Sequence, residues 1–148
     1  MSAVDELYQE IILDHYRAPR NKGACPDCGR TAHHSNPLCG DEIDVHVLLT
    51  GDRIDKVRFD GHGCSISQAS ASMMAEQAEG TSVAEALALG QAVREMMHGD
   101  GHADDELERR LGDLASLAGV ARFPVRVKCA LLPWAALGDC LADAGGSP

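Results

Sequence analysis

Apolar residues near the start of the chain recur three and four positions apart, which is the spacing of one face of an α-helix. This pattern predicts an amphipathic helix over 4–17, with the following residues on its apolar face: Val4, Leu7, Tyr8 and Ile11. The helix is expected to end at Ala18, because the residue before a proline (here Pro19) avoids helical backbone angles.

Strict alternation of apolar and polar residues predicts two strands further along, over 41–50 and 54–60. The turn signal Gly51-Asp52 between them indicates an antiparallel hairpin. The preceding stretch, 19–40, is interrupted repeatedly by proline and glycine, so we expect it to form a long irregular loop. A loop of this length in a compact domain usually has a function or is tied down by something.

Helical signals dominate the rest of the chain. One helix is expected from about Ser65 to near Gly80, and Ser82 with Glu85 matches a capping box that opens a second helix, ending at about Met97.

After a polar loop, Asp104 is expected to cap a third helix that ends at Gly119, with a leucine stripe on its buried face: Leu107, Leu111, Leu114 and Leu117. An extended connection over 123–128 and a last helix containing Trp134, Leu137 and Leu141 complete the pattern. The expected fold is therefore α+β, a small antiparallel sheet packed against several helices.

The length of 148 residues predicts one domain over 1–148, with a frayed tail at 144–148. A net charge of −10 argues against binding to nucleic acid or to anionic lipid, both of which require a basic surface. No run of 18 apolar residues is present, and the first twenty residues contain acidic side chains but no apolar core of a signal peptide. We therefore expect a cytoplasmic protein that does not enter a membrane.

Three of the six cysteines lie at breaks between predicted elements: Cys39, Cys64 and Cys129. Gly40 would allow Cys39 and Asp41 to face one ion, and Cys64 and Cys129 each precede a predicted helix, whose N-terminus favours a thiolate. Shared by one zinc ion, the three thiolates and the Asp41 carboxylate would form a labile site, because a hard carboxylate is the weak ligand among soft thiolates. From spacing alone, three buried and inert cysteines remain an equally good interpretation.

Four sequence motifs, taken in order, resemble the NifU-like/IscU/SufU family of iron–sulfur assembly proteins. The resemblance extends from about Leu7 to Leu137 and is carried by the following segments: Ile12-Leu13-Asp14-His15-Tyr16-Arg17-Ala18-Pro19-Arg20-Asn21, Asn36-Pro37-Leu38-Cys39-Gly40-Asp41, Gly61-His62-Gly63-Cys64-Ser65-Ile66-Ser67, and Arg126-Val127-Lys128-Cys129-Ala130-Leu131. It implies a zinc site formed by Cys39, Asp41, Cys64 and Cys129, and it implies that Cys39 accepts persulfide sulfur.

Within this family the chain is most similar to SufU-type members. IscU-type members carry a histidine where this chain has Lys128, and SufU-type members carry an extra segment that would correspond to about 98–120 here. The resemblance implies a pyridoxal-phosphate cysteine desulfurase of the SufS type as partner, and downstream iron–sulfur assembly proteins as recipients. It implies a sulfur acceptor rather than a classical enzyme. The alternative is a scaffold that holds a transient [2Fe–2S] or [4Fe–4S] cluster on Cys39, Cys64 and Cys129.

Further residues have no assigned role in the family. Cys25-Pro26-Asp27-Cys28 is a C-x-x-C motif, for which a second zinc knuckle, a redox pair and an incidental loop all remain open. Cys140 is expected to pack in the core, and His15 to be structural or a docking residue rather than a ligand. Pro133, where the family usually has another residue, is expected to shift the start of the last helix.

Overall fold

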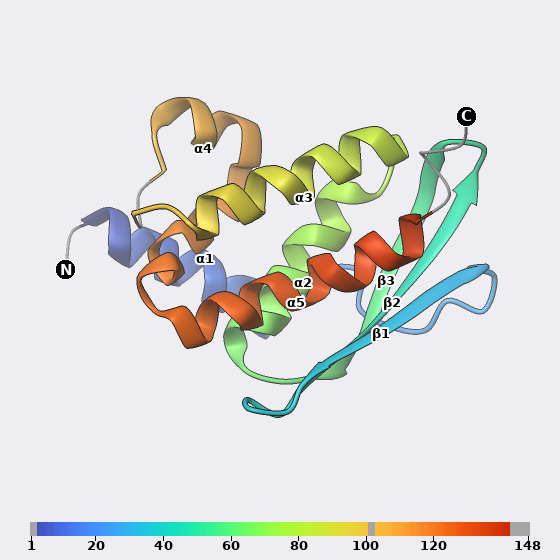
Figure 1. Ribbon diagram of the computed structural model, residues 1–148, viewed down its shortest axis with the longest axis horizontal. Helices are drawn as coiled ribbons and strands as arrows, with labels where there is room; N and C mark the ends of the chain where they lie inside the picture. The colour runs from blue at the N-terminus through green and yellow to red at the C-terminus, as the bar shows by residue number, and fades with distance from the viewer. Residues whose placement is uncertain (1–2, 101–102, 143–148) are drawn as a thin grey trace.

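The computed structural model describes residues 3–100 and 103–142. Helices cover one face of a three-stranded antiparallel sheet, and the other face of the sheet stays open (Figure 1). The predicted α+β class is therefore confirmed. The tail predicted at 144–148 lies outside the described residues.

The sheet has the order β1-β2-β3, in which β1 is Arg30–Asn36, β2 is Asp41–Thr50 and β3 is Arg53–His62. The predicted hairpin of β2 and β3 is confirmed. The prediction of an irregular loop over the whole of 19–40 is wrong, because β1 lies within it. This edge strand has the polar sequence Arg-Thr-Ala-His-His-Ser-Asn, so it gives almost no hydrophobic alternation, and its pairing with β2 places it in the sheet.

The first three helices begin and end close to the predicted positions. They are α1 (Ala3–Arg17), α2 (Ser65–Ala78) and α3 (Val83–Met97), and the capping box of Ser82 and Glu85 is present at the start of α3. The predicted apolar face of α1 is wrong in part, because Leu7 is exposed while Tyr8, Ile12 and His15 are buried. The side chain of Val4 lies outside the described part of the structure.

The single helix predicted after Asp104 is two elements. The helix α4 (Asp105–Leu111) is capped by Asp104 as expected, but it ends at Gly112, whose φ of 55° breaks the helix. The chain then continues as a 3-10 helix, η1 (Gly112–Arg122), past the predicted end at Gly119. The leucine stripe survives this break, because Leu111, Leu114 and Leu117 are fully buried.

The last helix, α5 (Pro124–Leu141), begins earlier than predicted, so the extended connection over 123–128 is wrong. Pro124 lies in its first turn, where proline's missing N–H is not needed. Pro133 lies buried inside α5 and does not set its start, which corrects the second expectation. Pro133 cannot donate to the carbonyl of Cys129, and Ser70 of α2 donates to the next carbonyl, that of Ala130, at 2.6 Å.

The core lies between the covered face of the sheet and the helices. α5 packs on β1 and β2, α2 packs on β3, and Trp134 and Phe59 are the largest buried side chains. His15 is buried as a structural residue, since its ring nitrogens lie 2.8 Å from both Ser72 Oγ and Asp113 Oδ2 and so tie α1 to α2 and η1.

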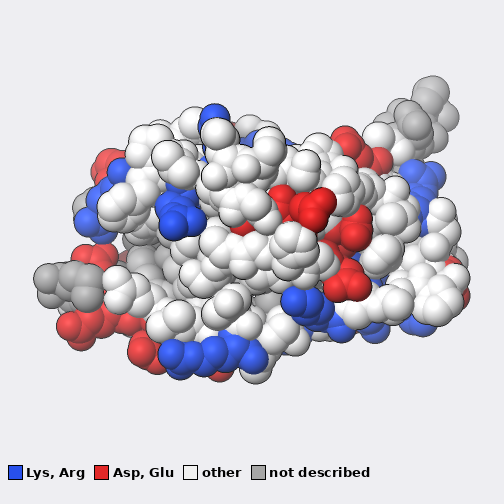
Figure 2. Space-filling view, turned by 90° about the horizontal axis from the view of Figure 1, so that it is seen from below, with Lys and Arg blue, Asp and Glu red and all other residues white. Residues whose placement is uncertain are grey.

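Two further predictions concern the surface of the molecule. None of the described helices is both long and apolar enough to cross a membrane. On the face shown in Figure 2, the described acidic and basic side chains lie in separate small groups, without an extended basic surface.

Candidate metal centre

Three cysteines and one aspartate from different parts of the chain meet at the end of the sheet where α2 and α5 begin. Cys39, Asp41 and Cys129 each offer a ligand atom, and these atoms all lie within 4.8 Å of one another. Cys64 completes the group, because its Sγ lies 3.9 Å from Asp41 Oδ2. The four residues of the predicted zinc site are therefore neighbours in space, although Cys39 and Cys129 are 90 positions apart.

Cys39 lies in the tight turn between β1 and β2, half-exposed beside the almost fully exposed Leu38. Asn36 shapes this turn, because its carbonyl accepts from the Cys39 N–H at 3.1 Å and its side-chain oxygen accepts from the Leu38 N–H at 3.2 Å. The Asn36 amide also points at Cys39 Sγ, 3.7 Å away. The role of Asn36 in this turn was not predicted, although asparagine before proline is a turn signal.

Asp41 is fully buried at the start of β2, and it is fixed by the next motif along the chain. Its Oδ1 accepts from the backbone N–H of Cys64 at 2.7 Å. A β-carbon on Gly63 would lie only 2.2 Å from that same Oδ1 and 2.7 Å from Ser67 Oγ, so a side chain at position 63 would displace the carboxylate. The absence of a side chain at Gly63 therefore provides the space that the Asp41 carboxylate occupies.

Cys64 precedes α2, as predicted, and is its N-cap residue. Cys129 does not precede its helix. It lies in the second turn of α5, fully buried, with Sγ 3.4 Å from Cys39 Sγ. The reason is that α5 begins at Pro124, so Cys129 is held by a helix interior and not by a flexible connection.

The charges of the site are set by burial and by one arginine. Burial raises the pKa of the Cys129 thiol far above its usual value, and its hydrogen bonds to Asp41 and Cys39 raise it further. Arg126 lies one turn earlier in α5, and a hydrogen bond to Cys129, with electrostatic attraction to Cys64 and Cys129 where these are ionised, raises the pKa of its guanidinium. The only strong cation among these contacts is therefore Arg126, at the exposed side of the site.

The donor set fits a zinc ion. Zinc binds thiolates at about 2.3 Å, so two sulfurs on one tetrahedral ion lie roughly 3.8 Å apart. Cys39 Sγ and Cys129 Sγ are already 3.4 Å apart, and Cys64 Sγ and Asp41 Oδ2 are 3.9 Å apart. Three soft thiols and a hard carboxylate suit Zn²⁺ with one weaker ligand.

Exposed apolar side chains surround the entrance to Cys39. An open hollow of about 610 Å³ is lined by Leu38, Cys39 and the first residues of α5, and Phe123 and Val125 are each more than half exposed. A second groove of about 640 Å³ lies between α1 and η1 and reaches Cys64. Such an apolar rim around a half-exposed thiol is typical of a surface that contacts another protein.

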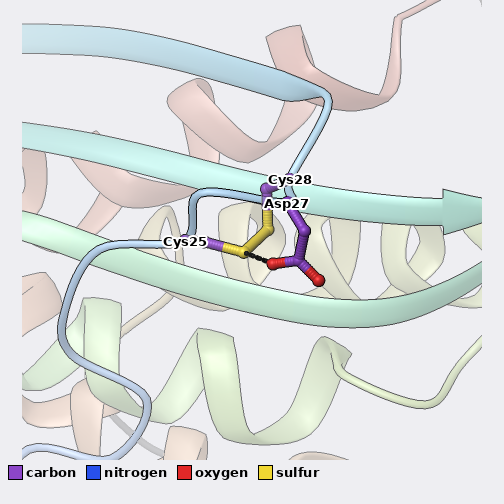
Figure 3. Close-up of side chains that lie close together, drawn as sticks. All are labelled: Cys25, Asp27 and Cys28. Carbon is purple, nitrogen blue, oxygen red and sulfur yellow. Dashed lines mark hydrogen bonds between the residues drawn. A yellow bond between two sulfur atoms is a disulfide. The ribbon is translucent and has the colours of Figure 1, made fainter.

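The other three cysteines lie elsewhere. Cys25 and Cys28 are joined by a disulfide in the loop before β1 (Figure 3), so in this state their sulfurs cannot be thiolate ligands of a second zinc knuckle. Cys140 is buried in the core, as predicted, with Sγ 3.3 Å from the carbonyl of Val45. Burial raises the pKa of its thiol to about 11.

Comparison with known proteins gives consistent matches over nearly the whole chain. The NifU-like N terminal domain family matches residues 7–130. The zinc-dependent sulfurtransferase SufU of Bacillus subtilis is 43% identical over 97% of this chain and 95% of that protein. The iron–sulfur cluster assembly scaffold protein IscU of Streptococcus pyogenes is 38% identical over 95% of this chain and 86% of that protein.

Solved structures show the same fold. The putative iron–sulfur cluster assembly scaffold protein for the SUF system from Fervidobacterium islandicum has a TM-score of 0.82 and 38% identity, covering 92% of this chain and 97% of that one. A NifU-like N-terminal protein from Brucella abortus has a TM-score of 0.80 at 23% identity, which bears on the fold alone.

Proposed function

The chain belongs to the NifU-like N-terminal domain family, and we propose that it is a zinc-dependent acceptor of persulfide sulfur in iron–sulfur cluster assembly. One observation carries this proposal beyond the family. Of the three clustered thiols, Cys39 is half-exposed at the tip of a turn, while Cys129 is fully buried behind it. Cys64 is half-exposed as well, but it is the N-cap residue of α2, so Cys39 is the reachable sulfur that lies on a surface turn.

We assign the zinc ligands to Cys39, Asp41, Cys64 and Cys129. When bound, zinc supplies the positive charge that favours thiolates over thiols. Asp41 contributes a carboxylate fixed by the Cys64 N–H, and Cys129 contributes a sulfur that solvent does not reach. Cys39 is the ligand on the most mobile type of element, a surface turn, and so it is the one most easily freed for chemistry.

Sulfur acceptance is then a thiol–disulfide type of exchange at Cys39. The Cys39 thiolate attacks the outer sulfur of a persulfide on the partner, a new S–S bond forms at Cys39, and the partner's own S–S bond breaks. The partner cysteine leaves as a thiolate. Arg126, beside the three thiols, provides positive charge where the incoming persulfide and the leaving thiolate are both negative.

The partner in this proposal is a pyridoxal-phosphate cysteine desulfurase of the SufS type, acting in the cytoplasm and followed by downstream iron–sulfur assembly proteins. The apolar rim of Leu38, Phe123 and Val125 supports docking of a protein at the entrance to Cys39. Docking there would also exclude water from the exchanging sulfurs.

The alternative function is a scaffold on which a [2Fe–2S] or [4Fe–4S] cluster is built and passed on. Cys39, Cys64 and Cys129 would be the ligands, since three thiolates with one exchangeable position suit such clusters. This alternative is favoured by the similarity to proteins named as scaffolds, and by the presence of three thiols in one site. It predicts thiolate-to-iron absorption after anaerobic reconstitution.

The test is sulfide release by a SufS-type desulfurase with and without the zinc-loaded protein. We expect strong stimulation by the wild type and none by Cys39→Ser, whose circular dichroism should be unchanged. Cys140→Ser is the matched control, because it removes a thiol far from the solvent, and it should stimulate as the wild type does. Full sulfur acceptance by Cys39→Ser would overturn the proposal, and no stimulation of an active desulfurase would favour the scaffold.

A further inference from the structure

The C-x-x-C motif lies on the open face of the sheet, away from the site just described. The first half of its loop is pinned to the outer edge of β3, where Gly23 N–H donates to the Phe59 carbonyl at 2.8 Å. Lys56 of β3 holds Asp27 at 2.8 Å, and the chain then enters β1 at Arg30, on the far side of β2. The loop therefore crosses in front of the strands, with the helices behind them (Figure 3).

The two groups of cysteines are too far apart to share a ligand or exchange sulfur within one chain. Cys28 lies next to the Arg30 end of β1, whereas Cys39 follows the Asn36 end, which pairs with Asp41. The strand between those ends covers about 20 Å at roughly 3.3 Å per residue. Cys25 and Cys28 therefore need a role of their own.

The Cys25–Cys28 bond is both reachable and dispensable for the fold. Both cysteines are half-exposed, and neither belongs to the core between the sheet and the helices. The bond closes a loop between residues only three positions apart, so it removes little freedom from the unfolded chain. A disulfide that is exposed and structurally unnecessary is of the labile kind that exchanges with other thiols.

We propose that Cys25 and Cys28 form a reversible dithiol/disulfide site that exchanges electrons with a protein dithiol of the thioredoxin type. In the exchange, a partner thiolate attacks one sulfur of the pair and forms a mixed disulfide, and the second partner thiol then displaces it. The Cys25–Cys28 bond breaks, the partner's disulfide forms, and two electrons and two protons pass to this chain. This reaction is independent of sulfur acceptance at Cys39.

Asp27 makes the two thiols of the reduced pair unequal. Its Oδ1 lies 3.3 Å from Cys25 Sγ, and its other oxygen is held by Lys56, which lowers the pKa of the carboxyl group. Once the pair is reduced, a charged carboxylate at this distance would accept a hydrogen bond from the Cys25 thiol and oppose its ionisation. Cys28 is therefore the more reactive thiol of the reduced pair.

The experiment uses the zinc-loaded full chain with its pair oxidised, incubated with thioredoxin, thioredoxin reductase and NADPH. We expect one NADPH to be consumed per chain and two further cysteines, mapped to Cys25 and Cys28, to become alkylable. A Cys25→Ser/Cys28→Ser variant should consume none, and Cys140→Ser should behave as the wild type. Equal consumption by the double variant would overturn the proposal.

Zinc content and alkylation rates provide two further readouts on the same samples. A pair that stays reduced in air and holds a second equivalent of zinc would assign the motif to a metal site and overturn redox exchange. In the reduced single variants, Cys28 in Cys25→Ser should alkylate several-fold faster than Cys25 in Cys28→Ser. Adding Asp27→Asn to Cys28→Ser should remove most of this difference, which an incidental loop would not show.

Discussion

The two ends of the sheet use cysteine in opposite ways. At one end, Cys39, Cys64 and Cys129 come from a turn, a helix N-cap and a helix interior, and they meet around a buried carboxylate. At the other end, Cys25 and Cys28 are near neighbours in sequence and lie in one exposed loop, already bonded to each other. The first group depends on the whole fold for its geometry, and the second depends on four residues.

This contrast shows that the environment, and not the residue, decides what a thiol does. Buried backbone and a buried carboxylate hold sulfurs apart at distances that suit an ion, whereas a short flexible loop lets two sulfurs bond directly. Changes that disturb packing should therefore affect the first end strongly and the second end little.

The largest effect is expected from Gly63→Ala. The added β-carbon would overlap the Asp41 carboxylate, which is fully buried, so zinc binding should weaken by about 3 kcal/mol, or roughly a hundredfold. Gly29→Ala in the Cys25–Cys28 loop is the matched control, because its β-carbon meets nothing within 4 Å. Competition with a chromophoric chelator measures both variants, and equal zinc affinities would contradict the packing argument.

Cys140 adds a third case to the comparison, a free thiol buried in the core away from both groups of cysteines. Its pKa is about 11 in the folded chain against an ordinary value of 9.0, so the thiol is neutral in both states below pH 9. As the pH rises from 9 towards 11, only the unfolded state ionises, and stability is lost. Urea unfolding of the zinc-loaded protein should lose about 2 kcal/mol over this window relative to Cys140→Ala. If the free energy of unfolding depended on pH in the same way for both proteins, the Cys140 thiol would not be the group responsible.

Arg126→Gln should slow sulfur acceptance about fivefold, because it removes the cation beside the three thiols. Lys128→Gln removes the same charge two positions along α5, on a nearly opposite side of the helix, and should have little effect. Raising the salt concentration should bring the wild-type rate towards that of Arg126→Gln. A rate that is insensitive to both changes would show that positive charge at this position is not used.

The smallest effect is expected from Cys25→Ser/Cys28→Ser. Because this pair lies at the far end of the sheet, zinc affinity and stimulation of the desulfurase should change less than about twofold. The same two assays that detect Gly63→Ala measure this variant. A large loss in either assay would mean that the two ends of the sheet are coupled.

Elements that are stabilised by their own local sequence could be predicted from that sequence. The alternation in β2 and β3 and the capping box at Ser82 give boundaries close to those observed. The strand β1 could not be found in this way, because its side chains are polar and the backbone of β2 holds it in place. The break at Gly112 and the early start of α5 at Pro124 do carry local signals, a glycine with positive φ and a proline in the first turn, but the leucine stripe and the expected extended connection pointed the other way.

The candidate site could be predicted only in part from the sequence. Gly40 and Gly63, both with positive φ, lie next to Cys39 and Cys64, but the meeting of Cys39 with Cys129 depends on how α5 crosses the sheet. The positions of the four residues suggest that they could share an ion, and the resemblance to a known family favours this grouping over three inert cysteines. That 98–120 is an insertion within the family, and that the four residues bind zinc, remain predictions.

The contact between Cys39 and Cys129 has a consequence for the chain while it is being made. On the ribosome, Cys25 and Cys28 emerge together and can meet at once, whereas Cys39 must wait for α5, near the end of synthesis. A nascent, stalled or truncated chain therefore displays Cys39 with nothing behind it. Under the proposed function, a chain that lacks α5 would have an incomplete zinc site and should not accept sulfur.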